Sequence, residues 1–333
     1  MSIEYFKMYP QWVEDIYAKQ FYKLWTFVYM FLFSWVPFSV GDLFYAIVVL
    51  FILVLVYKIF SSIFRSNYQL AKCSSLQLCC ILLTLYNLFY INWGLNYFRI
   101  PLAEKLGLKT QNISELEHEK VLYQYIDRIN NIRDSLELST KSKLGVRGDI
   151  VQFMYKDTLF DYTLSKSQIR IKEPLSSELV SYFSVSGYFN PFTMEAQINQ
   201  AMPLASYPFV IVHELAHQMG IGLEDECNFI AFAKLQNHSN IWYRYAAYYA
   251  ALQYLIAPYI NNKDKMAIIN ARLSPAVLAD FREERLFWSR YSGPIDILSG
   301  WFYNYFLKHN NQPEGMIRYS MMSRLVVAWE MRR

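Results

Sequence analysis

The segment from Val210 to Phe229 reads VIVHELAHQMGIGLEDECNF and carries two histidines four residues apart, with a glutamate directly after the first. On a helix, His213 and His217 lie one turn apart on the same face, so both imidazoles can bind one tetrahedral Zn²⁺ at about 2.0 to 2.1 Å. Glu214 can accept a proton from a zinc-bound water and later pass it to a leaving amine. This HExxH pattern predicts a zinc hydrolase.

A catalytic zinc site needs a third protein ligand and leaves a fourth position for water. In the arrangement HExxHxxGxxH the third ligand would fall at Leu223, which cannot bind a metal. The next segment, LEDECNFIAFA, places Glu224 and Asn228 at i and i+4 of a second helix. We expect Glu224 to be the third ligand and Asn228 to hold a ligating histidine by a hydrogen bond. Glu226 is the alternative ligand.

Other parts of a hydrolase site have weaker signals in the sequence. An extended segment beside the active helix can pair with a peptide substrate, and residues Thr193 to Asn199 form either such an edge or a purely structural strand. A transition-state donor is usually Tyr, His or Arg, and we select Tyr319. Cys227 is the one cysteine expected outside the membrane region, so it is predicted to be a packed residue and not part of a disulfide.

The composition indicates a membrane part. Of the 333 residues, 54% are hydrophobic and only 18% are charged, which is too apolar for an ordinary soluble enzyme. The mean hydropathy of +0.09 indicates an apolar portion joined to a water-soluble one. The net charge of +4 is spread along the chain without a basic run, which argues against a nucleic-acid partner. The expected partners are a lipid bilayer and a peptide or protein substrate.

Three apolar segments lie at about residues 21–40, 43–64 and 74–93. Each is close to the roughly 20 residues that cross a bilayer core, so residues 1–98 are predicted to form an anchor of three transmembrane helices. The loop between the second and third segments carries Lys58, Arg65 and Lys72 without an acidic residue, which predicts a cytoplasmic loop. With three spans the N-terminus is then also cytoplasmic and everything after the third span is extracytoplasmic.

From Arg99 onward the chain changes character, and residues 99–333 are enough for one sizeable domain. Ser114 and Glu117 have capping-box spacing at the start of an amphipathic helix. The segments SQIRIKEPL and GYFNPFTMEAQIN predict short strands, whereas most later segments predict helices. The fold class is therefore mainly α (α+β): three spans followed by a mostly helical domain with a small β-sheet.

The segments GYFNPFTMEAQIN, HELAHQMGIGLEDECNFIAF and NYFLKHNNQPEGMIRYSMMSRLV closely resemble the bacterial membrane-protein family called domain of unknown function 3810. NWGLNYFR, at the end of the third predicted span, fits it too, so the resemblance covers nearly the whole chain. That family is similar to zinc metallopeptidases of the gluzincin kind, in which a glutamate of an ExxxD or ExxxN element completes the HExxH site. The resemblance implies a zincin-like domain in the cytoplasmic (inner) membrane of a bacterium, with Glu224 and Asn228 as the ExxxN element.

Two functions of different class follow from these observations. The first is a membrane-anchored zinc-dependent metallopeptidase that hydrolyses peptide bonds with a zinc-bound water activated by Glu214. The alternative is a non-catalytic zinc-binding scaffold or interaction protein. Structural zinc sites usually fill all four positions with protein ligands, often cysteine. Three ligands and an adjacent glutamate therefore favour catalysis.

Overall fold

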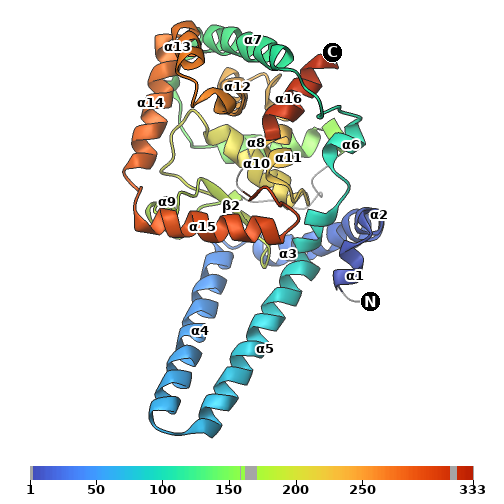
Figure 1. The fold of residues 1–333 in the computed structure, drawn as a ribbon, viewed down its shortest axis with the longest axis vertical. Helices are drawn as coiled ribbons and strands as arrows, with labels where there is room; N and C mark the ends of the chain where they lie inside the picture. The colour runs from blue at the N-terminus through green and yellow to red at the C-terminus, as the bar shows by residue number, and fades with distance from the viewer. Residues whose placement is uncertain (1–2, 158, 162–170, 316–320, 333) are drawn as a thin grey trace.

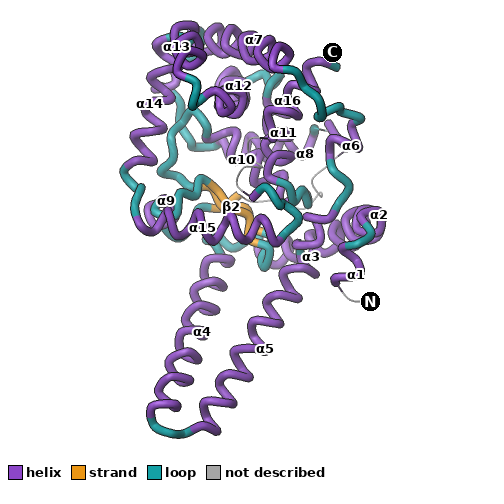
Figure 2. Tube along the Cα trace, viewed as in Figure 1, coloured by secondary structure: helices purple, strands orange, loops and turns teal. Residues whose placement is uncertain are grey.

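The computed structural model describes residues 3–157, 159–161, 171–315 and 321–332. The described chain is mainly helical with one small sheet, and two long helices extend side by side from one end of a helical domain (Figures 1 and 2). The predicted mainly α fold with a small sheet is confirmed at this level.

The N-terminal part contains α1 (Ile3–Lys7), α2 (Pro10–Trp12), a π-helical stretch (Val13–Phe21), α3 (Tyr22–Phe33), α4 (Val40–Phe64), α5 (Tyr68–Asn92) and a 3₁₀ turn (Gly94–Phe98). The domain continues with α6 (Leu102–Leu106), α7 (Glu115–Asp134), α8 (Val146–Lys156), β1 (Ile171–Lys172), α9 (Ser177–Ser181), β2 (Gly187–Asn190) and β3 (Glu195–Ile198). Its last elements are α10 (Tyr207–Gln218), α11 (Glu224–Leu235), α12 (Ile241–Ile256), α13 (Lys263–Arg272), α14 (Pro275–Ser289), α15 (Pro294–His309) and α16 (Met322–Met331). Further 3₁₀ turns lie at Leu138–Thr140, Leu159–Asp161 and Ala257–Tyr259.

Among the described residues, α4 and α5 are the two helices that are long and apolar enough to cross a membrane. Each has 25 residues and is therefore about 37 Å long, against about 30 Å for a bilayer core. Only 6% and 11% of their most apolar windows are buried inside the protein. Apolar helices that leave almost all of their surface uncovered differ from the core helices of a soluble domain.

The prediction of a first span at about residues 21–40, which would give three spans in all, is wrong. α3 continues the helical backbone of α2 and the π-helical stretch, but after its last charged residue, Lys23, only about ten residues, about 15 Å of helix, remain before the helix ends at Phe33, which is too short to cross a bilayer. The π-helical stretch before it carries Glu14, Asp15 and Lys19. One face of α3 is buried against the domain while the other exposes large apolar side chains, so its composition resembles that of a span. The predicted separation of the N-terminus from the domain depended on this span, and in Figure 1 the described N-terminal helices and the domain lie at the same end of the α4–α5 hairpin.

The sheet has the strand order β1-β3-β2, with β3 parallel to β1 and antiparallel to β2. β3 lies inside residues Thr193–Asn199, so this segment is central in the sheet and cannot be its edge, contrary to one of the two alternatives. β2 is an outer strand. The amide of Asn199 donates to the carbonyl of Ser186 at 3.0 Å. Ser186 and Asn199 are therefore a hydrogen-bonded pair. Hydrogen-bonded and non-hydrogen-bonded pairs alternate along antiparallel strands, so Gly187 and Phe189 belong to non-hydrogen-bonded pairs and their backbone N–H and C=O groups point away from β3.

The helix of the HExxH motif, α10, lies in the centre of the domain beside α11 and α12 (Figure 1). Almost every residue of α10 and every residue of α11 is buried. α7 packs on α12 and begins at Ser114 with the predicted capping box. Burying two consecutive helices that together carry four acidic residues requires specific partners for those carboxylates.

A second cluster of buried side chains joins the N-terminal elements to the domain. Its N-terminal members come from the π-helical stretch, α3 and the segment that follows α5, and its domain members directly precede β3 and α11: Val13, Tyr17, Ala18, Tyr22, Trp93, Leu95, Tyr97, Met194 and Leu223. Glu14 in this region forms an ion pair of 2.9 Å with Arg99. Residues on both sides of the predicted domain boundary at 98/99 therefore share one packed interior.

Candidate metal centre

A sharp turn after α10 brings the first residue of α11 back to the HExxH face. Gly220 has a φ of 85°, a left-handed conformation that glycine adopts without a steric penalty. The amides of Gly220 and Ile221 donate to the carbonyls of His217 and Ala216 at 2.9 and 3.1 Å and close the helix. α11 then begins at Glu224. The turn is short because the helix ends abruptly at this glycine.

Three donor atoms converge at this point. Nε2 of His213 lies 3.1 Å from Nε2 of His217, and the two nitrogens lie 3.2 and 3.5 Å from Oε2 of Glu224. Ligands at about 2.0 to 2.1 Å from a tetrahedral zinc ion lie about 3.3 Å from each other. The three measured separations therefore match one face of such a tetrahedron, and the donor set of two imidazoles and one carboxylate suits Zn²⁺.

The opposite ring nitrogens of both histidines have fixed acceptors. Nδ1 of His213 lies 2.8 Å from Oδ1 of Asn228, and Nδ1 of His217 lies 2.9 Å from the carbonyl of Ile221. Each acceptor favours a proton on Nδ1, which leaves the Nε2 lone pair directed at the carboxylate. Lone pairs that face each other repel unless a cation lies between them. The predicted contact between Asn228 and one of the two histidines is present.

The two oxygens of Glu224 have separate partners. Oε2 faces the imidazoles, while Oε1 accepts a hydrogen bond of 2.7 Å from the hydroxyl of Tyr303 on α15. Burial by itself would raise the pKa of Glu224, but the adjacent imidazoles outweigh burial and lower it well below its usual value. Glu226, the alternative ligand, instead accepts from the amide of Leu102 at 2.6 Å. The structure thus brings Glu224, and not Glu226, to the histidines.

Glu214 lies next to the three converging residues without sharing their contacts. Its Oε2 atom is buried and has no hydrogen-bond partner among the described residues. Burial raises the pKa of its carboxyl group, as a proton acceptor in such a site requires. The outer strand β2 runs close by: a Cβ atom at Gly187 would lie 2.8 Å from Cγ and 2.9 Å from Oε1 of Glu214. Glycine at this position therefore lets the strand approach the carboxylate.

The C-terminal carbonyls of α10 receive donors from the N-terminal elements. Nε1 of Trp93 donates to the carbonyl of His217 at 2.9 Å, the hydroxyl of Tyr22 donates to Gln218 at 2.8 Å, and Nη1 of Arg99 donates to Gly220 at 2.7 Å. Carbonyls at the C-terminal end of a helix lack some of the amide partners that interior carbonyls have, and these side chains add donors there. The segment next to α5 and the region before α4 therefore position the helix that carries His217.

Sequence reasoning missed Tyr303, Gly187 and Trp93, which lie far from the motif in the chain. Trp93 belongs to the NWGLNYFR segment after α5, where polar and aromatic residues directly follow an apolar run, and this was a usable signal. Tyr319, the predicted transition-state donor, lies outside the described residues. Cys227 is buried, as predicted, with Sγ 3.3 Å from Nδ1 of His217.

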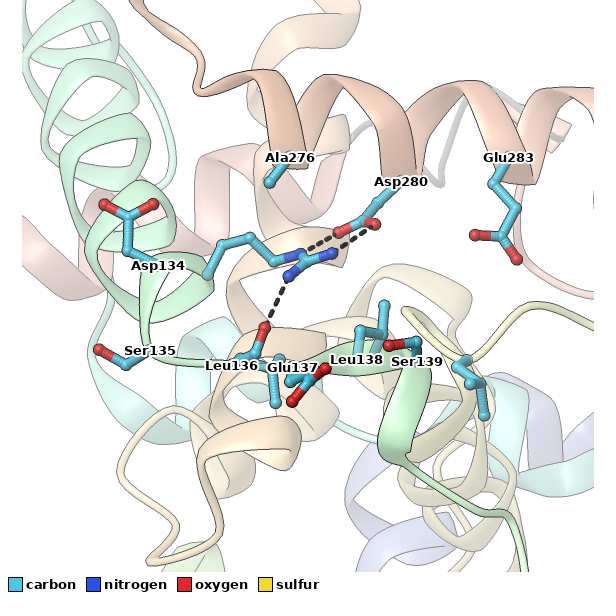
Figure 3. Close-up of a pocket in the computed structure, with 11 residues that line it drawn as sticks. Asp134, Ser135, Leu136, Glu137, Leu138, Ser139, Ala276, Asp280 and Glu283 are labelled. Carbon is cyan, nitrogen blue, oxygen red and sulfur yellow. Dashed lines mark hydrogen bonds and ion pairs between the residues drawn. The ribbon is translucent and has the colours of Figure 1, made fainter.

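A separate cavity of about 720 Å³ lies between the end of α7 and α14 (Figure 3). Its central cation, Arg133, pairs with Asp280 and donates to the carbonyl of Leu136. None of the residues of the candidate metal centre lines this cavity. The guanidinium of Arg133 in this cavity is already paired, and the cavity is separate from the candidate metal centre.

Comparison with models of known protein families gives a match over most of the chain. A family model described as "Protein of unknown function (DUF3810)" matches residues 17–327. The matched range includes α4, α5 and the helices of the candidate metal centre. No curated protein and no solved structure matches the chain.

Proposed function

The chain belongs to the DUF3810 family, whose description assigns no activity, and we propose from its site that it is a membrane-anchored zinc-dependent metallopeptidase. The observation that carries this proposal is the triangle formed by Nε2 of His213, Nε2 of His217 and Oε2 of Glu224, with sides of 3.1, 3.2 and 3.5 Å. In this proposal the domain is zincin-like and these three residues bind Zn²⁺.

The surrounding residues have distinct roles in hydrolysis. A bound Zn²⁺ lowers the pKa of water and polarises a carbonyl group. Glu214, whose Oε2 has no protein partner among the described residues, accepts the proton of the attacking water and delivers it to the leaving amine. Asn228 and the carbonyl of Ile221 keep the imidazoles oriented.

A peptide is the substrate class that the neighbouring strand fits. The outward backbone groups of Gly187 and Phe189 can pair with an extended chain. This strand lies beside Glu214, because Gly187 leaves room for the carboxylate. A peptide added at this edge would bring its own carbonyls next to the proton acceptor.

The α4–α5 hairpin supplies the membrane anchor. Lys58, Arg65 and Lys72 lie at or near the turn between the two helices, and basic loops stay in the cytoplasm. Because a two-span hairpin returns the chain to the side it left, the N-terminal segment and the domain both lie on the extracytoplasmic side. In this proposal the protein resides in the cytoplasmic membrane of a bacterium.

The test is a comparison of the full chain with Glu214→Gln in detergent or in lipid nanodiscs. We expect both proteins to contain about one zinc ion per chain, and only the parent to cleave a mixed peptide library. Glu283→Gln, which changes an exposed glutamate on α14, is the matched control and should cleave like the parent. Equal cleavage by the parent and Glu214→Gln, or no cleavage by a zinc-loaded parent, would contradict the proposal and favour the scaffold alternative.

A further inference from the structure

α15 has two faces of different character. One face is turned to the protein, where Leu307 is buried and Tyr303 contacts Glu224. The opposite face exposes large apolar side chains at helical spacing: Ile297, Leu298, Trp301, Phe302 and Tyr305. Ile297 is 73% exposed and Trp301 is 62% exposed. Soluble surfaces rarely gather so many large apolar side chains without a partner.

α3 repeats this pattern. Tyr22, Thr26 and Met30 are buried on one side of the helix. Its other side exposes Leu24, Phe27, Val28, Phe31 and Leu32, and Trp35 and Phe38 continue the apolar surface in the loop before α4. We call the exposed apolar residues of α3, this loop and α15 the apolar base.

The apolar base lies where the hairpin meets the domain. Figure 1 shows α15 crossing the end of the domain from which α4 and α5 project, with α3 at the same level. At one side the ring of Phe306 on α15 lies 5.8 Å from that of Phe89 in the last turn of α5. The hydroxyl of Tyr90 also donates to Oδ1 of Asn310 at 2.8 Å. These contacts hold the C-terminal end of α15 beside the C-terminal end of α5.

The start of α4 is tied to the domain at the same level. The amide of Gly41 donates to Oε2 of Glu195 at 2.7 Å, and Glu195 also pairs with Lys172, a buried residue of β1. The ring of Phe44, one turn into α4, lies 4.9 Å from that of Phe192. The domain-proximal ends of both α4 and α5 thus contact the domain. These contacts fix the position of the apolar base relative to the two helices.

We propose that the apolar base is a membrane-binding surface, with α3 and α15 lying in the plane of the bilayer interface. A lipid surface is the occupant because the base is continuous with two candidate spans that would already hold it at the bilayer. Trp and Tyr on an exposed helix face suit the interface, where one end of each ring is apolar and the other wet. The exposed Lys23 and Lys308 lie at the ends of these helices, where lysine can reach lipid headgroups.

This arrangement brings the metal centre close to the membrane. Tyr303 touches Glu224 from the inner face of the same helix that exposes Trp301 and Phe302 on its outer face. A helix with its side chains is about 10 to 12 Å across. The ligand Glu224 is therefore separated from the lipid interface by about one helix diameter, and a substrate must reach the centre beside the membrane surface.

The test measures the environment of single nitroxide labels on the full chain in nanodiscs. Cys73, Cys79 and Cys80 are replaced by Ser, the buried Cys227 is kept, and Ile297→Cys or Phe31→Cys supplies the label site. Leu116→Cys is the matched control, because Leu116 is a 78% exposed leucine on α7. Collision with oxygen, which concentrates in lipid, is compared with collision with a water-soluble nickel chelate.

We expect the Ile297 and Phe31 labels to collide several-fold more with oxygen than with the nickel chelate, and the Leu116 label to show the reverse. Labels at Ile297 and Phe31 that resemble the one at Leu116, or that avoid both reagents because another protein copy covers them, would overturn the proposal.

A second measurement, which needs no cysteine changes, also tests whether the apolar base touches lipid. Lipids brominated near the headgroup should quench the tryptophan fluorescence of the parent, and less so that of Trp301→Phe, whereas Trp242→Phe, at a buried position, should leave the quenching unchanged. Neither measurement depends on zinc binding or hydrolysis, so its failure would leave the proposed activity standing.

Discussion

The hydroxyl of Tyr303 donates a 2.7 Å hydrogen bond to Oε1 of Glu224, although 79 residues separate the two in the chain. This contact fixes the carboxylate so that its other oxygen faces the two imidazoles. It also joins α15 to the candidate metal centre. The apolar base and the site therefore share one helix.

Tyr303→Phe removes this hydrogen bond and keeps the ring. Residues that orient metal ligands typically contribute 10- to 100-fold to metal affinity, so we expect zinc to bind about 10-fold more weakly, as measured by competition with a chelator. Tyr305→Phe is the matched control, because Tyr305 is exposed on the outer face of α15. Equal zinc affinity in both variants would show that the hydroxyl does not position Glu224.

Substitution of the ligands distinguishes Glu224 from Glu226. We expect Glu224→Ala, like His213→Ala and His217→Ala, to abolish stoichiometric zinc as measured by elemental analysis. Glu226→Gln should retain zinc, because Glu226 binds the amide of Leu102 and lies outside the cluster. Full zinc occupancy in Glu224→Ala would show that the carboxylate of Glu224 is not a zinc ligand.

The sequence predicted the site residues that are close in the chain and missed those that are distant. His213 and His217 follow from helix periodicity, and Glu224 with Asn228 follows from the same rule one helix later. The contacts of Trp93 and Tyr303 with this region depend on how α5 and α15 pack on the domain. The NWGLNYFR pattern marks Trp93 as unusual but does not give its partner, and no local pattern marks Tyr303.

The first predicted span failed for a related physical reason. α3 is apolar on its exposed face and also packs Met30 and Tyr22 into the protein. A hydropathy window sums both faces and does not see that the uncharged part of this helix, from Lys23 to its end at Phe33, is too short for a bilayer. α4 and α5 were predicted because their apolar runs are long and nearly free of charged residues.

Gly187→Ala tests the proximity of the outer strand to Glu214. An added Cβ atom would lie 2.8 Å from Cγ and 2.9 Å from Oε1 of Glu214, which forces the carboxylate or the strand to move. We expect peptide cleavage to fall at least 10-fold, since small displacements of catalytic groups are costly, while zinc stoichiometry is kept. Gly148→Ala on α8 is the control, because a Cβ atom there meets nothing within 4 Å. Parent-like cleavage by Gly187→Ala would show that the strand is not constrained against Glu214.

Glu14 links the N-terminal segment to the turn after α10 and predicts a pH-dependent stability. Its carboxylate pairs with Arg99 at 2.9 Å and with Lys105 at 2.6 Å, and Arg99 in turn donates to the carbonyl of Gly220. Burial would raise the pKa of Glu14, but the two cations outweigh burial and lower it from 4.5 to about 2. The pair therefore contributes stability that is present above pH 4.5 and is lost as the pH falls toward 2.

We expect Glu14→Gln to destabilise the protein by about 2 kcal/mol near pH 7, because it leaves two partly buried cations without their shared carboxylate. The gap between parent and variant should narrow below pH 4.5, where the parent begins to take up the proton. Thermal unfolding in detergent, followed by circular dichroism at pH 7 and pH 3, measures this difference. Asp127→Asn is the control, because Asp127 is exposed on α7 and forms no ion pair among the described residues. A Tm difference between parent and Glu14→Gln that stays the same at both pH values would show that this carboxylate does not stabilise the junction through its charge.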